Sequence, residues 1–471
     1  MITKERKQFS LFGDNWIYKN LLERFPEHPL VKMKPLIDNL LSKIEKDISV
    51  YYSAGFGRPS YPPAMLLKML LLEYLYNLSD VAVSQGVCCN ILFRWFCGLD
   101  IDESVPDDTT LVKFRNRLGE DGFKEIFNTF ITLAQQLGYG KGKLKILDAT
   151  HVFSFSRGLS VVGLLKDGLK RVMMRLKEKS VKIKEQTKRA VITVTDVKKK
   201  VKVKELTRLI RKLVSDVNNQ ADEKTKKVLR LMQEVAEGVG DKLGSLVDTD
   251  ARWGYKSKDF SFFGYKAHLA CDEMGFVTNL EVLSGEKNEG SRLKDMILEE
   301  RKRGDKIEGV PADALYDSAA NREYLKSVAI KAYIPSRTKS SEIDKFEVIG
   351  SQVMCAMGKH SIGSIEQENG RLHYFSVKDC RDCSYYRGCV SAGEIRKKVY
   401  ISKCKLLRAE DYKLKMRERK TIERVNAWAK RHLGLVRARY CGITKVLIQA
   451  ILTFLAMDLK IMIRGPCSGM V

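Results

Sequence analysis

Hydrophobic residues recur every three or four positions through the first 140 residues of the chain. This spacing is typical of helices packed against a core, and it is clearest from Ala64 to Leu75. Pro62 and Pro63 suit the first turn of that helix, because a proline there gives up no intrahelical hydrogen bond. Residues 1–140 are therefore predicted to form an all-helical N-terminal domain.

A period of two begins at Lys143, where charged and apolar residues alternate up to Leu147 and Asp148 follows at once. This alternation predicts a strand that ends at Asp148. The same pattern before and after the turn 272–275 predicts an antiparallel hairpin of strands 264–271 and 276–283. Later segments favour a helix at 291–303, an apolar run ending at Asp313, a helix at 321–327 and a strand at 331–334. We expect one mixed sheet flanked by helices, in an α/β domain made of residues 141–337 and 409–464.

A strongly basic segment interrupts this α/β domain. Between Arg157 and Arg230 there are 23 Lys and Arg against 8 Asp and Glu, which supplies +15 of the formal net charge of +26. Helical apolar spacing persists, so residues 157–245 are predicted to form a basic, mainly helical insertion. Alternating β-branched residues leave a strand possible at Val191–Val203.

The amino-acid composition and the net charge limit the classes of protein to which the chain could belong. A net charge of +26 over 471 residues favours an acidic macromolecular partner, and 44% hydrophobic residues favour a folded chain. The longest apolar stretch, Val446–Met457, is shorter than the roughly 20 residues of a membrane span, so we expect a core helix and no membrane association. The first residues lack the apolar region of a secretory signal, which favours the cytoplasm.

Several cations of the N-terminal region are candidates for phosphate binding, although each is equally typical of a solvated helix face. They are Arg58, Lys68, Arg94, Lys113, Arg115 and Arg117.

Cysteines cluster in residues 338–408, a segment that we predict to be a loop-rich, small Cys-rich subdomain. Cys380, Cys383 and Cys389 have the spacing C-x2-C-x5-C, and Cys355 could supply a fourth thiolate. Four thiolates suit one structural Zn²⁺, and the alternative is a set of free thiols. The cysteines in apolar patterns are expected in the core; they are Cys88, Cys89, Cys97, Cys271 and Cys441.

Three acids are candidates for metal-dependent chemistry. Asp148 and Asp313 each follow a predicted strand, and Glu423 lies on a late helix whose apolar residues face the other way. Carboxylates brought together repel one another unless a hard cation such as Mg²⁺ or Mn²⁺ neutralises them. Each acid taken alone is equally typical of a solvated position. Arg419 and Lys430 share the helical stripe of Glu423.

Five segments together resemble the bacterial insertion-sequence transposases of the DDE type. Arg419, Glu423 and Lys430 match three members of the family's tyrosine, arginine, glutamate and lysine signature, with Met416 at the tyrosine position. Tyr412, one helical turn earlier, could replace that tyrosine. The other similar segments are 57–117, Leu147–Thr150, Asp248–Arg252 with Gly264–His268, and Ala312–Ser318, in which Leu315 stands where the family usually has glycine.

This resemblance implies a ribonuclease H-like fold and a site in which Asp148, Asp313 and Glu423 bind two Mg²⁺ or Mn²⁺ ions. It implies DNA contacts by Arg419, Lys430 and Tyr412. Asp317 is the rival for the second acid, while Asp248 and Asp250 are expected to be structural. The N-terminal domain and the basic insertion would recognise element ends, or the insertion would clamp phosphates or support dimerisation.

The implied activity is DNA transposition on double-stranded DNA, by a homodimer at the bacterial nucleoid. Terminal inverted repeats would be bound, phosphodiester bonds cleaved and 3′-hydroxyl ends joined to target DNA. Two alternatives remain open. One is a metal-dependent DNA nuclease of the same fold, and the other is a catalytically decayed, transposase-derived DNA-binding protein, suggested by Met416 and Leu315.

Overall fold

The computed structural model describes most of the chain, with gaps that include much of the basic insertion. The described residues are 14–52, 60–175, 208, 211, 222–238, 242–256, 259–335, 346–367, 370–390, 393–402 and 412–465. The segment Val191–Val203, for which a strand was considered, lies outside these ranges.

The N-terminal region is helical, as predicted. Its helices are α1 (Asp14–Arg24), α2 (Pro29–Ser49), α3 (Pro63–Leu75), α4 (Asp80–Cys89), α5 (Ile91–Cys97) and α6 (Asp108–Gln136). Twelve of the thirteen residues of α3 are buried, so α3 is the centre of this bundle. Pro63 occupies its first turn, as the sequence predicted.

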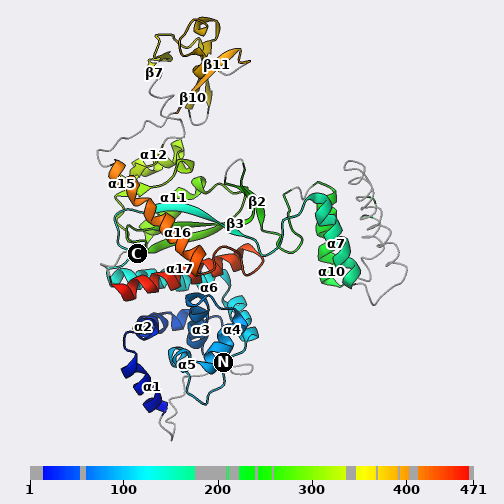
Figure 1. Cartoon of the computed structure of the whole chain (residues 1–471), viewed down its shortest axis with the longest axis vertical. Helices are drawn as coiled ribbons and strands as arrows, with labels where there is room; N and C mark the ends of the chain where they lie inside the picture. The colour runs from blue at the N-terminus through cyan, green and yellow to red at the C-terminus, as the bar shows by residue number, and fades with distance from the viewer. Residues whose placement is uncertain are drawn as a thin grey trace.

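The last helix, α17 (Ile443–Arg464), joins the N-terminal bundle to the rest of the molecule. It packs against α2, α3 and α6 on one side and against the sheet strand β4 (Val277–Ser284) on the other (Figure 1). One hydrophobic cluster runs through all of these elements. Among the described residues α17 is the single helix long and apolar enough to cross a membrane, and 83% of its most apolar stretch is buried in the protein. It is the core helix that the sequence predicted.

The main sheet has four strands, all of them antiparallel to their neighbours. They are β1 (Ile146–Phe153), β2 (Arg252–Tyr255), β3 (Ser261–Cys271) and β4, and the central β3 pairs with the other three. The predicted hairpin is confirmed as β3 and β4. The chain thus mixes helices with several small sheets, which is consistent with the α/β class.

Two expectations about the strands were wrong. The parallel strands β5 (Gly309–Pro311) and β6 (Lys331–Tyr333) form a separate small sheet, which an isolated bridge between Leu144 and Gly309 links to the segment leading into β1. The expected single mixed sheet is therefore divided. The first strand also continues beyond Asp148, because its pairing with β3 extends as far as Phe153.

Helices and short turns complete the α/β region. They are η1 (Glu289–Arg292), α11 (Leu293–Lys302), η2 (Ala314–Tyr316), α12 (Ala319–Ser327), α15 (Tyr412–Glu418) and α16 (Lys420–His432). The expected helices at 291–303 and 321–327 correspond to α11 and α12. Helix α16 packs on β1, which positions its polar face near the start of the sheet.

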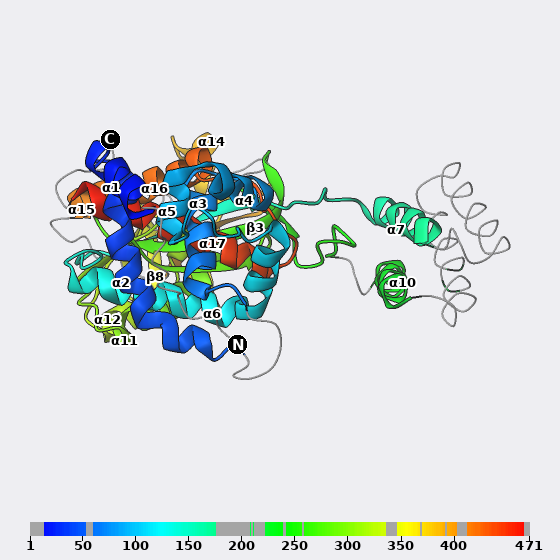
Figure 2. The same ribbon diagram turned by 90° about the horizontal axis from the view of Figure 1, so that it is seen from below.

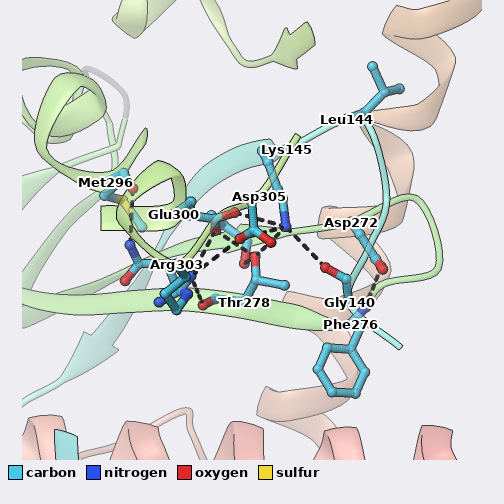
Figure 3. A network of polar contacts seen from close by, with 12 residues as sticks. Gly140, Leu144, Lys145, Asp272, Phe276, Thr278, Met296, Glu300, Arg303 and Asp305 are labelled. Carbon is cyan, nitrogen blue, oxygen red and sulfur yellow. Dashed lines mark hydrogen bonds and ion pairs between the residues drawn. The ribbon is translucent and has the colours of Figure 1, made fainter. Parts of the chain in front are cut away.

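A buried network of ion pairs and hydrogen bonds lies where the main sheet and the small sheet meet (Figure 3). Lys145 Nζ lies 2.8 Å from Glu300 Oε2, and both side chains are 0% exposed. Thr278 of β4 donates a hydrogen bond to Glu300 Oε1 at 2.5 Å, and Arg303 donates one to the Thr278 carbonyl at 2.6 Å. The network ties β1, β4 and α11 together.

Two parts extend from this body. The described helices of the basic insertion, α7 (Val161–Arg175) and α10 (Glu223–Ala236), pack on each other through their own small core and project away from the sheet (Figures 1 and 2). We call them the basic arm. The Cys-rich subdomain lies at the opposite end of the molecule from the N-terminal helices (Figure 1).

The described part of the Cys-rich subdomain contains five short strands, which the sequence pattern did not predict, joined by loops and turns. Its elements are β7 (Phe346–Ile349), β8 (Gln352–Cys355), β9 (Gly363–Gln367), β10 (Gly370–Ser376), η3 (Lys378–Cys380), α14 (Tyr386–Cys389) and β11 (Arg396–Ser402). Every residue of β9 is exposed, and among the described residues of the subdomain the buried core cluster consists of Val353, Phe375 and Val399. Strands exposed to this degree need no regular alternation, which is why the sequence pattern missed them.

Candidate active site on strand β1 and helix α16

Asp148 is the third residue of β1, with Leu269 of β3 as its pairing partner. Asn426 of α16 donates a hydrogen bond from Nδ2 to Asp148 Oδ2 at 3.1 Å. Burial, together with the negative charges of Asp313 and Glu423 and against the opposing charge of Arg419, raises the pKa of Asp148 to about 6. The first candidate acid is therefore partly buried and has the other two as electrostatic neighbours.

Asp313 comes two residues after β5 and begins the turn η2. Its side chain caps that turn by accepting a hydrogen bond from the Leu315 amide at 2.8 Å. The amide of Lys145, just before β1, donates to the carbonyl of Gly309 in β5 at 3.0 Å, so the two strands lie next to each other. This contact explains how acids 165 positions apart become neighbours.

Glu423 lies in the first turn of α16 and is half exposed. Arg419, directly before the helix, lies with Nη2 2.7 Å from Glu423 Oε1. On the opposite face Ile422, Val425 and Ala429 are fully buried, as the sequence predicted. The helix thus presents Glu423 near Asp148 while its apolar side packs on β1.

The donor set suits a hard divalent cation, although the carboxylates have other partners in this arrangement. Asp148 is bound to Asn426, Asp313 to the Leu315 amide and Glu423 to Arg419. Within the described ranges, no three His, Cys, Asp or Glu side chains are grouped as metal ligands. The mutual repulsion that raises the pKa of Asp148 is nevertheless the effect that a bound cation would relieve.

Two cations and a histidine adjoin the acids. Lys430 Nζ lies 3.4 Å from the ring nitrogens of His151, a β1 residue. Burial and, next, the charge of Lys256 lower the pKa of Lys430 to about 8. Burial also lowers the pKa of His151 to about 4, with Lys430 and Lys256 contributing. His151 is therefore neutral near pH 7, beside two positive charges.

Sequence reasoning missed Asn426, His151 and Lys256. The only available signal was spacing, since Asn426 lies three residues after Glu423 and His151 three residues after Asp148. Such spacing is common in any helix or strand, and the relevant contacts are made between β1 and α16.

Tyr412 and Asp317 lie together beside the small sheet. The Tyr412 ring centroid is 6.3 Å from that of Tyr333, and burial raises the pKa of Tyr412, which Asp317 also raises. Asp317 is almost fully buried and its Oδ1 lies 2.7 Å from Arg322 Nε. The rival second acid is thus engaged in an ion pair.

Asp248 and Asp250 hold the start of α17. Asp248 Oδ1 accepts a hydrogen bond from the Gly442 amide at 2.9 Å, and Asp250 Oδ2 accepts one from the Ile443 amide at 2.9 Å. Asp248 also accepts hydrogen bonds from Ser154 and Tyr265. Both acids thus have the kind of structural contacts that were expected of them.

Three of the N-terminal cations are buried, which argues against phosphate binding. Lys68 Nζ lies 2.6 Å from Asp38, Arg115 pairs with Asp80 at 2.6 Å, and Arg94 donates to the carbonyls of Asp100 and Glu103. For these three residues, the expected solvated or phosphate-facing position was wrong. Arg58 lies outside the described residues.

The four candidate zinc ligands share the Cys-rich subdomain. Burial raises the pKa of Cys380, and the neighbouring Cys355, Cys389 and Cys383 raise it further. Cys355 Sγ accepts a hydrogen bond from the Lys359 amide at 3.3 Å, and the Cys383 amide donates to the Cys380 carbonyl at 3.0 Å. The thiols are therefore near one another, in the subdomain with the smallest core.

The other cysteines divide between core and surface. Cys97 and Cys271 are buried as expected, whereas Cys88 and Cys89 are exposed and Cys441 is half-buried. The expectation was wrong for Cys88 and Cys89, which lie in the last turn of α4. Of the ten residues of this helix, only Val83 and Val87 are buried.

Comparison with protein families agrees with the resemblance seen in the sequence. Residues 19–117 match the family model described as "Transposase domain (DUF772)". Residues 224–459, half of the chain, match the model described as "Transposase DDE domain". This second match includes Asp313 and Glu423 and begins after Asp148. No solved structure matches the chain significantly. The chain therefore belongs to the DDE transposases of insertion sequences.

Proposed function

We propose that this protein is a DNA transposase that binds the terminal inverted repeats of its element, cleaves phosphodiester bonds there and joins the 3′-hydroxyl ends to target DNA. The observation that supports the proposal most is the match of residues 19–117 and 224–459 to transposase domains, and the packing of α16, which carries Glu423, on β1, which carries Asp148, is consistent with it. A ribonuclease H-like arrangement of the catalytic domain is part of the proposal.

Asp148, Asp313 and Glu423 would hold two Mg²⁺ or Mn²⁺ ions, which activate a water or 3′-hydroxyl and stabilise the leaving oxygen when bound. Two other residues of the chain position the carboxylates of that site. Asn426 orients the Asp148 carboxylate, and Arg419 holds Glu423 beside it. Both partners would have to share or release these carboxylates when a cation binds.

Cations around the acids would hold the DNA backbone. Lys430 and Lys256 both lie close enough to His151 of β1 to lower its pKa, and the charge of Lys256 also lowers the pKa of Lys430. A phosphate placed between them would relieve this repulsion. Arg419 and Tyr412 are further candidates for DNA contact, at the opposite end of the same run of helices.

Two copies of the protein would act together, because two element ends have to be held for joining. A net charge of +26 supports work on double-stranded DNA in the bacterial cytoplasm, at the nucleoid. The N-terminal helices and the basic arm are the candidates for recognising the ends.

Replacing Asp148 with Asn tests the proposed chemistry. We expect Asp148→Asn to lower Mg²⁺-dependent cleavage of DNA carrying element ends by more than about 100-fold, since a metal ligand supplies several kcal/mol of transition-state stabilisation. DNA binding, measured by fluorescence anisotropy, should persist. The exposed Asp121 on α6 offers a matched control, and Asp121→Asn should cleave normally. Unaltered cleavage by Asp148→Asn would remove the assigned role.

The same assay separates the alternatives. Joining of end-containing DNA, but not of scrambled DNA, supports a transposase. Cleavage without joining and without end preference would instead favour a nuclease. Binding to element ends without cleavage by the wild-type protein would favour a decayed copy, as Met416 and the exposed Leu315 suggested.

A further inference from the structure

A chain of buried hydrogen bonds leads away from the turn that carries Asp313. Tyr316, the last residue of η2, is fully buried and its hydroxyl lies 2.8 Å from His268 Nε2. His268 of β3 is also fully buried, and its Nδ1 lies 2.9 Å from Glu281 Oε1 on the paired strand β4. Arg292 is the last member of this series of hydrogen bonds, and its Nη2 lies 2.9 Å from Glu281 Oε2.

The chemistry of these groups fixes one proton of the network, the one between His268 and Glu281. Burial opposes ionisation of Glu281, but hydrogen bonds from His268 and Arg292, together with their charges, outweigh it and lower the pKa of Glu281. The ionised Glu281 can only accept, so His268 Nδ1 carries a proton. The other ring nitrogen of His268, Nε2, is hydrogen-bonded with the Tyr316 hydroxyl. Burial, and next the charge of Asp148, raise the pKa of Tyr316, so that hydroxyl keeps its proton.

The Tyr316 end of this chain is built into the acid site. The Tyr316 amide donates to the carbonyl of Asp313 at 3.2 Å, and the negative charges of Asp148 and Asp313 both act on the Tyr316 hydroxyl. On the far side, Asn321 Nδ2 donates to the Tyr316 carbonyl at 2.9 Å and to the Gly290 carbonyl at 2.7 Å. The position of η2, and with it the backbone of Asp313, therefore depends on how Tyr316 is held.

We propose that Tyr316, His268 and Glu281 form a positioning relay, which holds Asp313 in the orientation toward Asp148 that divalent-cation binding requires. Tyr316 acts through Asp313 and needs no contact with the cation. The inference rests on the proposed function, because it assumes that the acids form a metal site. It adds to that site residues of β3, β4 and η2 that do not ligate the metal.

Tyr316→Phe is the direct test, because it removes only the hydroxyl that begins the relay. We expect its dissociation constant for Mn²⁺, measured by electron paramagnetic resonance of the free ion, to rise about 10-fold, the lower end of the range for groups that orient metal ligands. The melting temperature is measured in parallel on the same full-length proteins. Mn²⁺ affinity within about twofold of wild type would overturn the proposal.

Tyr324→Phe is the matched control. Tyr324 lies on the neighbouring α12, and its buried hydroxyl has no hydrogen-bond partner, so the same chemical change there should leave Mn²⁺ affinity unaltered. An equal loss of affinity in both variants would reveal a general packing effect and would reject the relay.

A double-mutant cycle distinguishes a relay from two separate contacts. If Glu281 acts through His268 and Tyr316, adding Glu281→Gln to Tyr316→Phe should weaken Mn²⁺ binding little beyond the stronger single change. Multiplicative losses would contradict the coupling. Asp148→Asn separates the two levels of inference: unchanged Mn²⁺ binding in that variant removes the metal site itself, whereas its loss together with normal binding by Tyr316→Phe removes only the relay.

Discussion

Lys145 shows that the burial of a side chain can differ from what the alternating pattern of its segment predicts. It alternates with apolar neighbours in the same way as Lys143, which is exposed, yet its side chain is fully buried. The difference is its partner Glu300, which comes from α11 and neutralises the lysine in the interior. A buried charge is tolerated only when such a partner is present, and no local sequence pattern reveals it.

We expect Lys145→Met to lower the free energy of unfolding by about 3 kcal/mol, because it leaves the buried Glu300 with only the more distant cation Arg303, 3.7 Å away. Urea unfolding followed by circular dichroism would measure the loss. Lys143→Met is the control, since Lys143 pairs with Glu308 at the surface and should change stability little. Similar stability of the two variants would contradict the structural importance of the network in Figure 3.

Lys430 combines a functional position with an altered proton affinity. Burial and the charge of Lys256 lower its pKa to about 8, while His151 beside it is neutral and Asp148 favours its charged form. Lys430 therefore loses its charge as the pH rises through about 8. An exposed lysine would keep its charge up to about pH 10.

DNA affinity should consequently fall between pH 7 and 9, if Lys430 contacts phosphate. Protonated Lys430 binds the anion, so binding at higher pH has to take up a proton and becomes weaker. Lys430→Arg should remove most of this dependence, because arginine stays charged throughout. Anisotropy titrations of both proteins at constant ionic strength would measure it, and parallel pH profiles would speak against a phosphate contact.

At the scale of elements, α16 and the Cys-rich subdomain are opposite cases. The helical period of the sequence correctly separated the buried face of α16 from the face that carries Glu423. The Cys-rich subdomain has strands that the sequence did not reveal, and the buried core cluster of its described residues has three members. A core of this size contributes little stability, so a cross-link or a metal would be expected to support it.

We propose that Cys355, Cys380, Cys383 and Cys389 bind one structural Zn²⁺. Purified protein should then contain about one zinc per chain by mass spectrometry of the metal. Cys383→Ser should lose the zinc and make the subdomain sensitive to proteases. Cys88→Ser, at an exposed cysteine of α4, should retain it. Wild-type protein free of zinc after purification without chelators would favour free thiols.

At the scale of the whole molecule, the N-terminal helices and the sheet share one core, while the basic arm reaches outward (Figure 2). Helix α17 supplies much of the shared core by packing on both parts. The position of any DNA held by the N-terminal helices is therefore coupled to the acids through packed elements. The arm has its own small core, so its surface charges can be changed without disturbing the catalytic domain.

Neutralising the exposed cations of α10 tests whether the arm contacts DNA. Lys224, Lys227 and Arg230 changed together to Gln should weaken DNA binding and reduce the slope of log affinity against log salt by up to about 3, close to one unit for each lost phosphate contact. The same change at the exposed Lys302, Lys326 and Lys331 is the control for net charge. An unchanged slope together with a loss of dimers in light scattering would favour the dimerisation role.

The sequence by itself determined the features that depend on neighbours along the chain. These are the N-terminal helices, the β3–β4 hairpin, the core helix α17 and the apolar face of α16, all of which follow from a period of two or of about 3.6 residues. Tertiary structure alone decided which charges are buried, as at Lys145 and Arg115, and how far β1 extends past Asp148. It also decided the hydrogen bonds of Asn426 and Tyr316, because their partners lie tens to hundreds of positions away in the chain.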